Sequence, residues 1–497
     1  MAVCGRRLMK HFEVIIGLEV HVELKTRSKL FCGCSTEFGA DPNTHTCPVC
    51  LGMPGVLPVL NRQAVVYAAK AALALQCTIH SYSKFDRKQY FYPDLPKAYQ
   101  ISQYDQPLAE YGHVAIVNGG EVMKTVGVRR IHLEEDAGKL NHLGQRLGDA
   151  KGSLVDLNRA GVPLIEIVSE PDMRSADEAR LYLTELRNIL SYLDISDLRM
   201  EEGSMRCDAN VSLRPAEYVG SLEELPRVEI KNVNSIRNVQ RGIEYEVARQ
   251  AELLEAGERI IKETRGFDDQ SGRTYSQRSK EEANDYRYFP EPDLPPLVLT
   301  DAFVQEVAGS LPPSTMALRE ELREAGVQPK DIEVILSDQG ALTFWRQATT
   351  LFDDARLVTN WMLSDLSRLL NAHGDTFATS PISPEGLVEL LNLIKRGTLS
   401  GRMAKEVVDK MYETGKPAEA VVKNLGMSQI TDGEAIKKVV EEVVALHMPV
   451  VEDYLSGKDK ALGFLVGQVM KKTKGQAKPD VVNTTLKEVI RAVGEKT

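Results

Sequence analysis

The sequence predicts an α+β protein in three parts: a large strand-rich domain, a helical domain and a small helical tail. Up to residue 296, short stretches alternate between apolar and polar residues and are interrupted by glycine and proline, which is typical of half-buried strands. The proline-rich segment "DYRYFPEPDLPPL" closes this region, because proline excludes regular helix. Beyond it, apolar residues recur at helical spacing. We expect domains at residues 1–296, 297–425 and 426–497.

The composition is that of a globular protein. The chain has 497 residues, of which 43% are hydrophobic and 27% charged, so it can bury several cores. No run of about 18 apolar residues suggests a membrane span, and the opening "MAVCGRRLMKHFE" lacks the apolar core of a signal peptide. We expect a soluble, cytoplasmic protein. The net charge of -10 argues against general attraction to nucleic acid and leaves room for a local basic patch.

The first predicted strand, "IIGLEVHVEL" at residues 15–24, has two faces of different chemistry. Its apolar residues alternate with Glu19, His21 and Glu23, so a period of two sends the carboxylates and the imidazole to one side. Later predicted strands repeat this arrangement. Their polar faces carry His132, Glu134 and Asp136, then Glu166, then Arg206 and Asp208, and finally Glu229 and Lys231.

These polar faces predict a cation site if the strands share one sheet. Glu166 lies within a run that is apolar on both faces, where an unpaired charge is costly. Carboxylates about 4 Å apart repel by about 4 kcal/mol at an effective dielectric constant near 20. Oxygen ligands with one imidazole suit magnesium or manganese. A solvated sheet face remains the alternative for any single strand.

A bound nucleotide would have to be held by the metal and by basic side chains. The sequence contains neither of the common glycine-rich phosphate loops. The segment "RKQYFYPDLPKAYQISQYDQPL" places Lys88 and Lys97 among aromatic residues and prolines, and Arg206 and Lys231 lie on the polar strands. Each basic residue alone is typical of a surface. Together they are candidate clamps for a polyphosphate.

Two further clusters predict binding sites. Cys32, Cys34, Cys47 and Cys50 have the C-x-C and C-x-x-C spacing of a structural zinc site, an insert at residues 32–50. The alternatives are reduced cysteines in a loop, or disulfides, which a cytosolic location disfavours. Near the end of the chain, residues 456–478 carry six lysines against Asp459 alone, which favours a phosphate-contacting patch over a solvated helix end. These lysines are Lys458, Lys460, Lys471, Lys472, Lys474 and Lys478.

Seven segments between residues 17 and 297 resemble, in order, the motifs of the GatB family, the B subunits of the aspartyl/glutamyl-tRNA(Asn/Gln) amidotransferase. They are "GLEVHVEL", "RKQYFYPDLPKAYQISQYDQPL", "HLEEDAGK", "DLNRAGVPLIEIVSEPD", "MEEGSMRCDANVSLR", "EIKNVNS" and "DYRYFPEPDLPPL". The resemblance implies a mixed, mostly antiparallel β cradle followed by helices. It also implies a ligase that phosphorylates the side-chain carboxylate of mischarged Glu-tRNA(Gln) and/or Asp-tRNA(Asn) with ATP and replaces the phosphate with ammonia.

The resemblance also implies partners and residue roles. The A subunit of the amidotransferase would release ammonia from glutamine and deliver it through a tunnel, the C subunit would stabilise the complex, and the tail would bind tRNA. Magnesium would bind His21, Glu134 and Glu166. The catalytic residues would be Glu19, Lys88, Asp136 and Asp208, with Lys97, Arg206 and Lys231 on the nucleotide. The archaeal type E relative carries an inserted domain for which this chain has no room; the other alternative is a non-catalytic, zinc-stabilised tRNA-binding scaffold.

Overall fold

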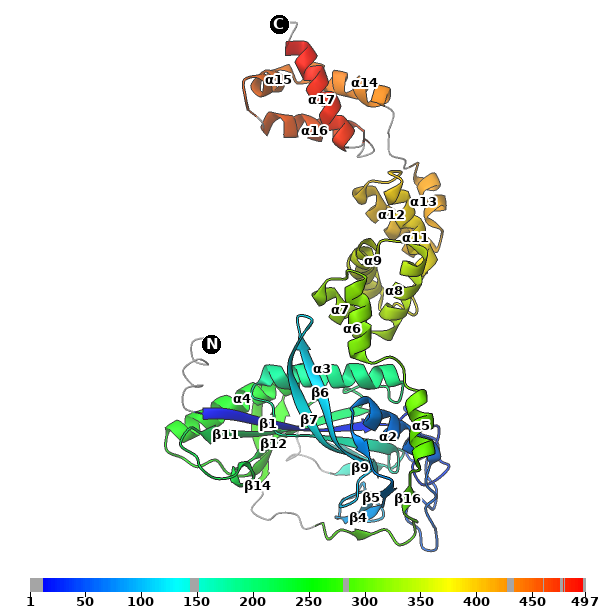
Figure 1. The fold of residues 1–497 in the computed structure, drawn as a ribbon, viewed down its shortest axis with the longest axis vertical. Helices are drawn as coiled ribbons and strands as arrows, with labels where there is room; N and C mark the ends of the chain where they lie inside the picture. Colours follow the sequence, from blue (N-terminus) through cyan, green and yellow to red (C-terminus); the bar gives the residue numbers. More distant parts are fainter. Residues whose placement is uncertain are drawn as a thin grey trace. The chain divides into compact units, whose positions relative to one another are not determined.

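The computed structural model describes residues 12–143, 152–279, 286–426, 433–458, 460–473, 477 and 479–494. Strands dominate the first part of the chain and helices the second (Figure 1), which confirms the predicted α+β class. The chain divides into two compact units, Met1–Leu318 and Arg319–Thr497. The first unit extends past residue 296 because α5 (Asp301–Gly309) packs against α2 (Arg62–Ala74). The domain boundaries at residues 296 and 425 stay predictions.

A nine-stranded sheet organises the first unit. Across the sheet the strands are β14 (Arg273–Ser279), β13 (Glu263–Asp268), β12 (Val228–Lys231), β11 (Met205–Pro215), β1 (Phe12–Glu23), β10 (Pro163–Ser169), β7 (Glu121–Glu135), β6 (Ala109–Asn118) and β2 (Thr78–Ile79). β12 and β13 run parallel, and every other neighbouring pair is antiparallel. The sheet is therefore mixed and mostly antiparallel, as predicted.

Helices cover one face of this sheet. α2, α3 (Ala176–Leu193) and α4 (Ile236–Glu255) pack on it. Each begins after a side chain that accepts a hydrogen bond from a free N–H of the first turn, a favourable start for a helix. Leu18, Val20 and Val22 of β1 point into this helix-covered core and are at most 1% exposed. The alternating residues of β1 therefore face the other side, which is polar.

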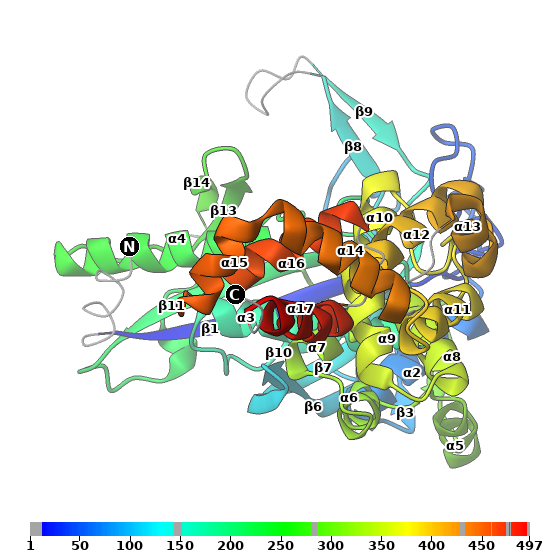
Figure 2. The ribbon, with the colours of Figure 1, turned by 90° about the horizontal axis from the view of Figure 1, so that it is seen from above.

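Three small sheets complete the first unit. They are β15 (Phe289–Pro290) with β4 (Asp86–Gln89) and β5 (Tyr99–Ser102), β16 (Leu297–Val298) with β3 (Tyr82–Ser83), and β8 (Lys139–His142) with β9 (Ser153–Asp156). The hairpin β8–β9 projects from the rest of the unit (Figure 2). β5 packs against β7, where Ser102 Oγ donates a hydrogen bond to Glu134 Oε2 at 2.8 Å. This contact brings the sheet that carries Lys88 to the polar face.

The remaining helical segments are short and amphipathic. They are the turn η2 (Leu222–Glu224) in the first unit, then α6 (Thr315–Glu324), α7 (Pro329–Leu336), α8 (Gln339–Leu351), α9 (Ala355–Trp361), η3 (Met362–Leu366), α10 (Ser367–His373), α11 (Pro384–Lys395), α12 (Gly401–Thr414), α13 (Ala418–Leu425), α14 (Gly433–Leu446), α15 (Met448–Leu455), α16 (Lys460–Lys472) and α17 (Pro479–Gly494). α14 to α17 enclose a core of their own that includes Val440, Leu465 and Leu486. Among the described helices, none is long and apolar enough to cross a bilayer.

Candidate metal and phosphate site

The polar face of the nine-stranded sheet forms the floor of a cavity of about 580 Å³. Strand register decides which side chains meet there: His21 of β1 lies opposite Glu166 of β10, and Glu166 lies opposite His132 of β7. Directly opposed residues share a face of the sheet. His21, Glu166 and His132 therefore share one face of the sheet, although they come from three different strands.

His21, Glu134 and Glu166 meet closely enough to hold one cation. One potential ligand atom from each lies within 4.8 Å of the others, and His21 Nε2 is 3.1 Å from Glu166 Oε2. Both carboxylates are nearly buried. Two carboxylates and an imidazole around one point suit a hard divalent cation. The donor set fits magnesium, and its role as a magnesium site stays a prediction.

His132 is a fourth member of this cluster. Its Nε2 lies 3.5 Å from Glu134 Oε2 and 3.6 Å from Glu166 Oε2. Burial opposes charge on Glu166, yet His132 and His21 hold the pKa of that carboxyl well below its usual range. Burial also opposes charge on Glu134, and His132 and Lys88 lower its pKa. The neighbouring imidazoles and Lys88 thus favour the ionised form of both carboxylates.

Basic side chains surround the cluster. Lys88 of β4 lines the cavity with Nζ 5.2 Å from the centre of the Tyr286 ring; burial opposes its charge, but Glu134 raises the pKa of Lys88 well above its usual value. Arg206 Nη2 donates to Asp136 Oδ2 at 2.6 Å. Against the effect of burial, Arg206 lowers the pKa of Asp136 to about 2. The cavity thus offers carboxylates on its floor and cations on its walls.

The other predicted acids of the site are also on this face. Burial, reinforced by Glu166 and Asp208, raises the pKa of Glu19, whose Oε1 accepts a hydrogen bond from Asn210 Nδ2 at 2.9 Å. Lys231 Nζ donates to Asp208 Oδ2 at 2.5 Å. Glu19, Asp136, Asp208, Arg206 and Lys231 are thus near the cluster, and their catalytic or nucleotide-binding roles stay predictions.

Lys97 lies apart from this cavity. It forms an ion pair with buried Glu135 and lines a smaller pocket with Phe31, Cys32 and Cys50. Glu135 points to the face of β7 opposite Glu134, which explains the separation. The structure therefore does not bring Lys97 together with Arg206 and Lys231.

The four clustered cysteines form a second candidate metal site. The sulfur atoms of Cys32, Cys34, Cys47 and Cys50 lie within 4.8 Å of one another, and all four are free thiols. A hydrogen bond from Cys32 lowers the pKa of Cys50 to about 4, and buried Lys29 lies with Nζ 3.7 Å from the Cys50 sulfur. Four sulfurs at this separation could bind a metal such as zinc.

Comparison with known proteins places this geometry in a family. The GatB/GatE catalytic domain family matches residues 14–305, and the GatB domain family matches residues 343–490. The chain is 53% identical over 481 residues to the aspartyl/glutamyl-tRNA(Asn/Gln) amidotransferase B subunit of Carboxydothermus hydrogenoformans, a match that covers 97% of this chain and 99% of that protein. It is 52% identical over 480 residues to the B subunit of Moorella thermoacetica, covering 96% and 99%. The chain belongs to the GatB family of amidotransferase subunits.

The region that matches the family's catalytic domain contains His21, Glu134 and Glu166, and also the four cysteines. The region that matches the second domain contains the lysines of α16. The two family matches thus assign the cavity to the catalytic domain and the predicted tRNA contacts to another part of the chain.

The lysines near the end of the chain differ from one another. Lys458 Nζ lies 2.8 Å from Asp453 Oδ1, and Lys472 pairs with Glu442. Lys460 is the first residue of α16 and Lys471 lies one residue before its end, and both lysines are exposed. Lys474 and Lys478 lie outside the described residues. Acids outside residues 456–478 thus compensate part of the positive charge, and tRNA binding by these lysines stays a prediction.

Sequence reasoning gave no role to several residues of the site. His132 was visible as part of the polar face, and its spacing from Glu134 was the available signal. Ser102, which donates to Glu134, and Arg159, whose Nε lies 3.6 Å from Asp136 Oδ2, carried no such signal. Ser102 reaches the cluster from a separate sheet and Arg159 from a turn, so strand alternation could not place either residue.

Proposed function

We propose that this chain is the activating subunit of a tRNA-dependent amidotransferase. It would phosphorylate the side-chain carboxylate of Glu-tRNA(Gln) and/or Asp-tRNA(Asn) with ATP, and would then let ammonia displace the phosphate to give the amide. The observation that carries the proposal is the cluster of His21, Glu134 and Glu166, two of which, His21 and Glu134, line a cavity that basic side chains also line. A carboxylate is a poor electrophile, and phosphorylation converts its oxygen into a leaving group.

The residues of the cavity suit phosphoryl transfer, which depends mainly on positioning and on neutralising charge. When bound, magnesium would neutralise phosphate charge and hold the phosphate oxygens in place. His132 and Ser102 keep Glu134 oriented toward His21 and Glu166. Lys88 makes no direct ion pair in the described part of the chain and keeps its ammonium free for an anion. Arg206 and Lys231, fixed by Asp136 and Asp208, would contact the remaining phosphate groups.

The rest of the complex would supply this site with tRNA and ammonia. We infer an A subunit that releases ammonia from glutamine, delivered through a tunnel, and a C subunit that stabilises the complex. The names of the relatives, which describe one subunit of an enzyme acting on tRNA(Asn/Gln), support these partners. The lysines of α16 would contact tRNA, the cysteines would bind a structural zinc, and the complex would work in the cytoplasm.

The deciding experiment is phosphate release from ATP by the assembled complex, with and without each mischarged tRNA. We expect release to depend on magnesium and on Glu-tRNA(Gln), Asp-tRNA(Asn) or both, with ammonium able to replace glutamine as nitrogen donor. The isolated chain should not hydrolyse glutamine, and robust glutaminase activity in it would contradict the assignment. A complex that binds the tRNA tightly yet releases no phosphate would favour the alternative, a non-catalytic tRNA-binding scaffold.

A further inference from the structure

Arg159 enters the wall of the cavity from the turn between β9 and β10. Its Nε donates to the carbonyl of Ala137 at 3.1 Å and its Nη2 to the carbonyl of Gly138 at 2.7 Å. These two bonds fix the plane of the guanidinium beside Asp136. Its third nitrogen, Nη1, makes no hydrogen bond within the described residues and lies on the side of Gly203, which also lines the cavity.

Arg159 and Arg206 share one carboxylate. Arg206 Nη2 lies 2.6 Å from Asp136 Oδ2, and Arg159 Nε lies 3.6 Å from the same oxygen. Asp136 is only 4% exposed, so one buried negative charge holds two guanidinium groups at the cavity wall. Glu23 and Glu134 also act on Arg206, so what remains for a ligand is not a surplus of charge but the donor of Arg159, Nη1, that neither Asp136 nor the two carbonyls engage. Two arginines with donors to spare are typical of a phosphate-binding site.

The cysteine knuckle, residues 32–50, holds the segment that carries Arg159. Asn43 Nδ2 donates to the Val155 carbonyl at 3.0 Å, and the Leu157 N–H donates to Asn43 Oδ1 at 2.8 Å. The His45 N–H donates to Asn158 Oδ1, and Asn158 Nδ2 donates to the Asp41 carbonyl, both at 2.8 Å. These four bonds connect the loop between the two cysteine pairs to three of the residues that precede Arg159.

Buried Lys29 extends the same connection to the cysteines. Its Nζ donates to the carbonyls of His45 and Leu157, at 2.7 and 3.2 Å, and lies 3.7 Å from the Cys50 sulfur. The Leu30 N–H then donates to the Gly161 carbonyl, and the Gly161 N–H to the Asp136 carbonyl, each at 2.8 Å. The turn around Arg159 is thus bounded by the knuckle on one side and by Asp136 on the other.

We propose that Arg159 and Arg206 together bind a phosphate group of the nucleotide, and that the cysteine knuckle is the device that positions Arg159 for this contact. The proposal rests on the proposed function, since it names the group that would hold one phosphate in the cavity. It gives the knuckle, which lies outside the cavity, a defined effect on nucleotide binding. Asn158 is a positioning residue in this scheme, because it acts through Arg159.

The first test is the affinity of the assembled complex for ADP with magnesium, measured by calorimetry at constant salt. Arg159→Met should raise the dissociation constant about tenfold, the size expected for one charge-assisted hydrogen bond. Arg159→Lys should recover part of the loss, since it restores the charge without the planar fork. The control is Arg129→Met, which removes an exposed arginine that pairs with Glu170 and does not line the cavity, and which should leave the affinity unchanged.

The second test separates positioning from direct contact. Asn158→Ala should raise the same dissociation constant about threefold in the wild-type background and should add nothing to Arg159→Met, because effects of coupled residues are not additive. Asn371→Ala, an exposed asparagine of α10, is the matched control. Full additivity of Asn158→Ala and Arg159→Met would refute the positioning role.

The outcomes also separate this inference from the proposed function. If Arg159→Met binds ADP as tightly as the wild type while Glu134→Gln still abolishes ATP cleavage, the arginine pair is refuted and the proposed function stands. If the wild-type complex binds no ADP, both fail. Melting temperatures recorded for every variant exclude loss of folding as the cause of weak binding.

Discussion

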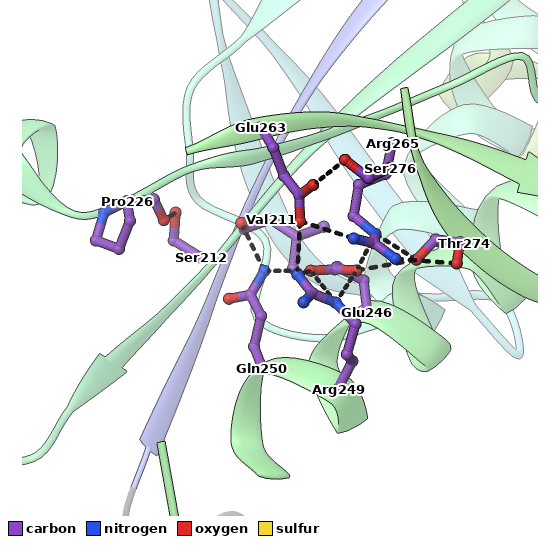
Figure 3. A network of polar contacts seen from close by, with 10 residues as sticks. All are labelled: Val211, Ser212, Pro226, Glu246, Arg249, Gln250, Glu263, Arg265, Thr274 and Ser276. Atoms are coloured by element: carbon purple, nitrogen blue, oxygen red, sulfur yellow. Dashed lines mark hydrogen bonds and ion pairs between the residues drawn. The ribbon is translucent and has the colours of Figure 1, made fainter. Parts of the chain in front are cut away.

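Two clusters of buried charge lie on the same large sheet and are built in opposite ways. The first is the cup, formed by His21, His132, Glu134 and Glu166 on the polar face. The second is the α4 network, in which Glu246, Arg249, Glu263 and Arg265 meet between α4 and the strands β13 and β14 (Figure 3).

In the α4 network, positive and negative side chains are equal in number and closely paired. Glu246 is fully buried and accepts hydrogen bonds from Arg249, Gln250 and Thr274. Glu263 accepts from Arg265 at 2.7 Å and from Ser276 at 2.5 Å. Burial opposes its charge, yet these donors lower the pKa of Glu263. A buried carboxylate with this many donors has little capacity left for a ligand.

In the cup, carboxylates and imidazoles lie close together, and not all of their hydrogen-bonding groups and charges are paired. His132 Nδ1 in the cup and Arg206 Nε beside it are buried without a hydrogen-bond partner in the described part of the chain. Lys88, on the wall above the cup, holds its charge near Glu134 without a direct ion pair among the described residues. Such incomplete pairing costs stability and is expected where a ligand completes the site. In the α4 network the buried atom without a partner in the described part of the chain is Gln250 Oε1, which belongs to a neutral amide. The comparison teaches that the density of buried charge does not distinguish a functional site; incompletely paired charged side chains do.

The largest expected effect is on catalysis, from Glu134→Gln. The change removes one negative charge and one strong metal-binding oxygen with little change of shape, so tRNA-dependent ATP cleavage should fall about 10³-fold, or about 4 kcal/mol in barrier height. The melting temperature should hardly move, since the amide can still accept from Ser102. Steady-state phosphate release and scanning calorimetry measure the two quantities. Cleavage at the normal rate would show that the cup is not catalytic.

The matched change in the other cluster, Glu246→Gln, should have the reverse profile. It leaves Arg249 and Arg265 with Glu263 as their shared carboxylate, and removing one partner from a buried ion pair destabilises a protein by about 3 kcal/mol. Calorimetry should therefore show a lower melting temperature, while ATP cleavage by the folded enzyme stays near the wild-type rate. If Glu246→Gln impaired cleavage without lowering stability, the distinction between the clusters would be wrong.

The cup could be predicted from the sequence to a large extent, and the α4 network could not. Alternation predicts that His21 of β1 and Glu134 of β7 lie on the polar faces of their strands. Glu166 lies in a run that is apolar on both faces, and the resemblance to the GatB family is what groups the three residues. Glu246 lies on a helix and Glu263 on a strand, and no short-range pattern relates their positions. Their contact depends on how α4 packs on β13, which is a tertiary property.

Loops and small sheets set a second limit on prediction. Lys97 resembled a nucleotide clamp because it shares a segment with Lys88, yet the chain turns between β4 and β5, and Lys97 pairs with Glu135 instead. Arg159 has no sequence pattern because it lies in a turn. Asn43 and Asn158 hold that turn, each with one hydrogen bond that it donates and one that it accepts. Glu442, which pairs with Lys472, is likewise distant in sequence from its partner, and Asp453, which pairs with Lys458, lies just before the basic segment.

Cys47→Ser removes one of the four clustered thiols, and so tests whether these thiols bind a metal in the folded protein. We expect about one zinc per wild-type chain and a loss of zinc in the variant, with stability lower by ~2 kcal/mol because a closed site contributes folding energy. ATP cleavage should fall less than stability does. Cys77→Ser, a buried thiol outside the cluster, should keep its zinc. Unchanged metal content and stability in Cys47→Ser would contradict a structural zinc site.

The smallest expected effect is on the salt dependence of tRNA binding, and it should differ between two neighbouring lysines of α16. Lys471 makes no ion pair among the residues that the structure describes, whereas Lys472 pairs with Glu442. A free lysine can neutralise a tRNA phosphate directly, but a paired one must first leave its acid. Lys471→Ala should therefore lower the slope of the logarithm of tRNA affinity against the logarithm of salt concentration by about one unit, and Lys472→Ala should lower it less. Removal of residues 456–497 should lower the slope by more than either single substitution. Saturating tRNA should partly restore ATP cleavage by the truncated enzyme but not by Glu134→Gln. Affinity for mischarged tRNA at several salt concentrations measures the slope. Equal slopes for the two alanine variants would show that ion pairing on this surface, unlike in the buried clusters, does not decide which charges remain available to a ligand.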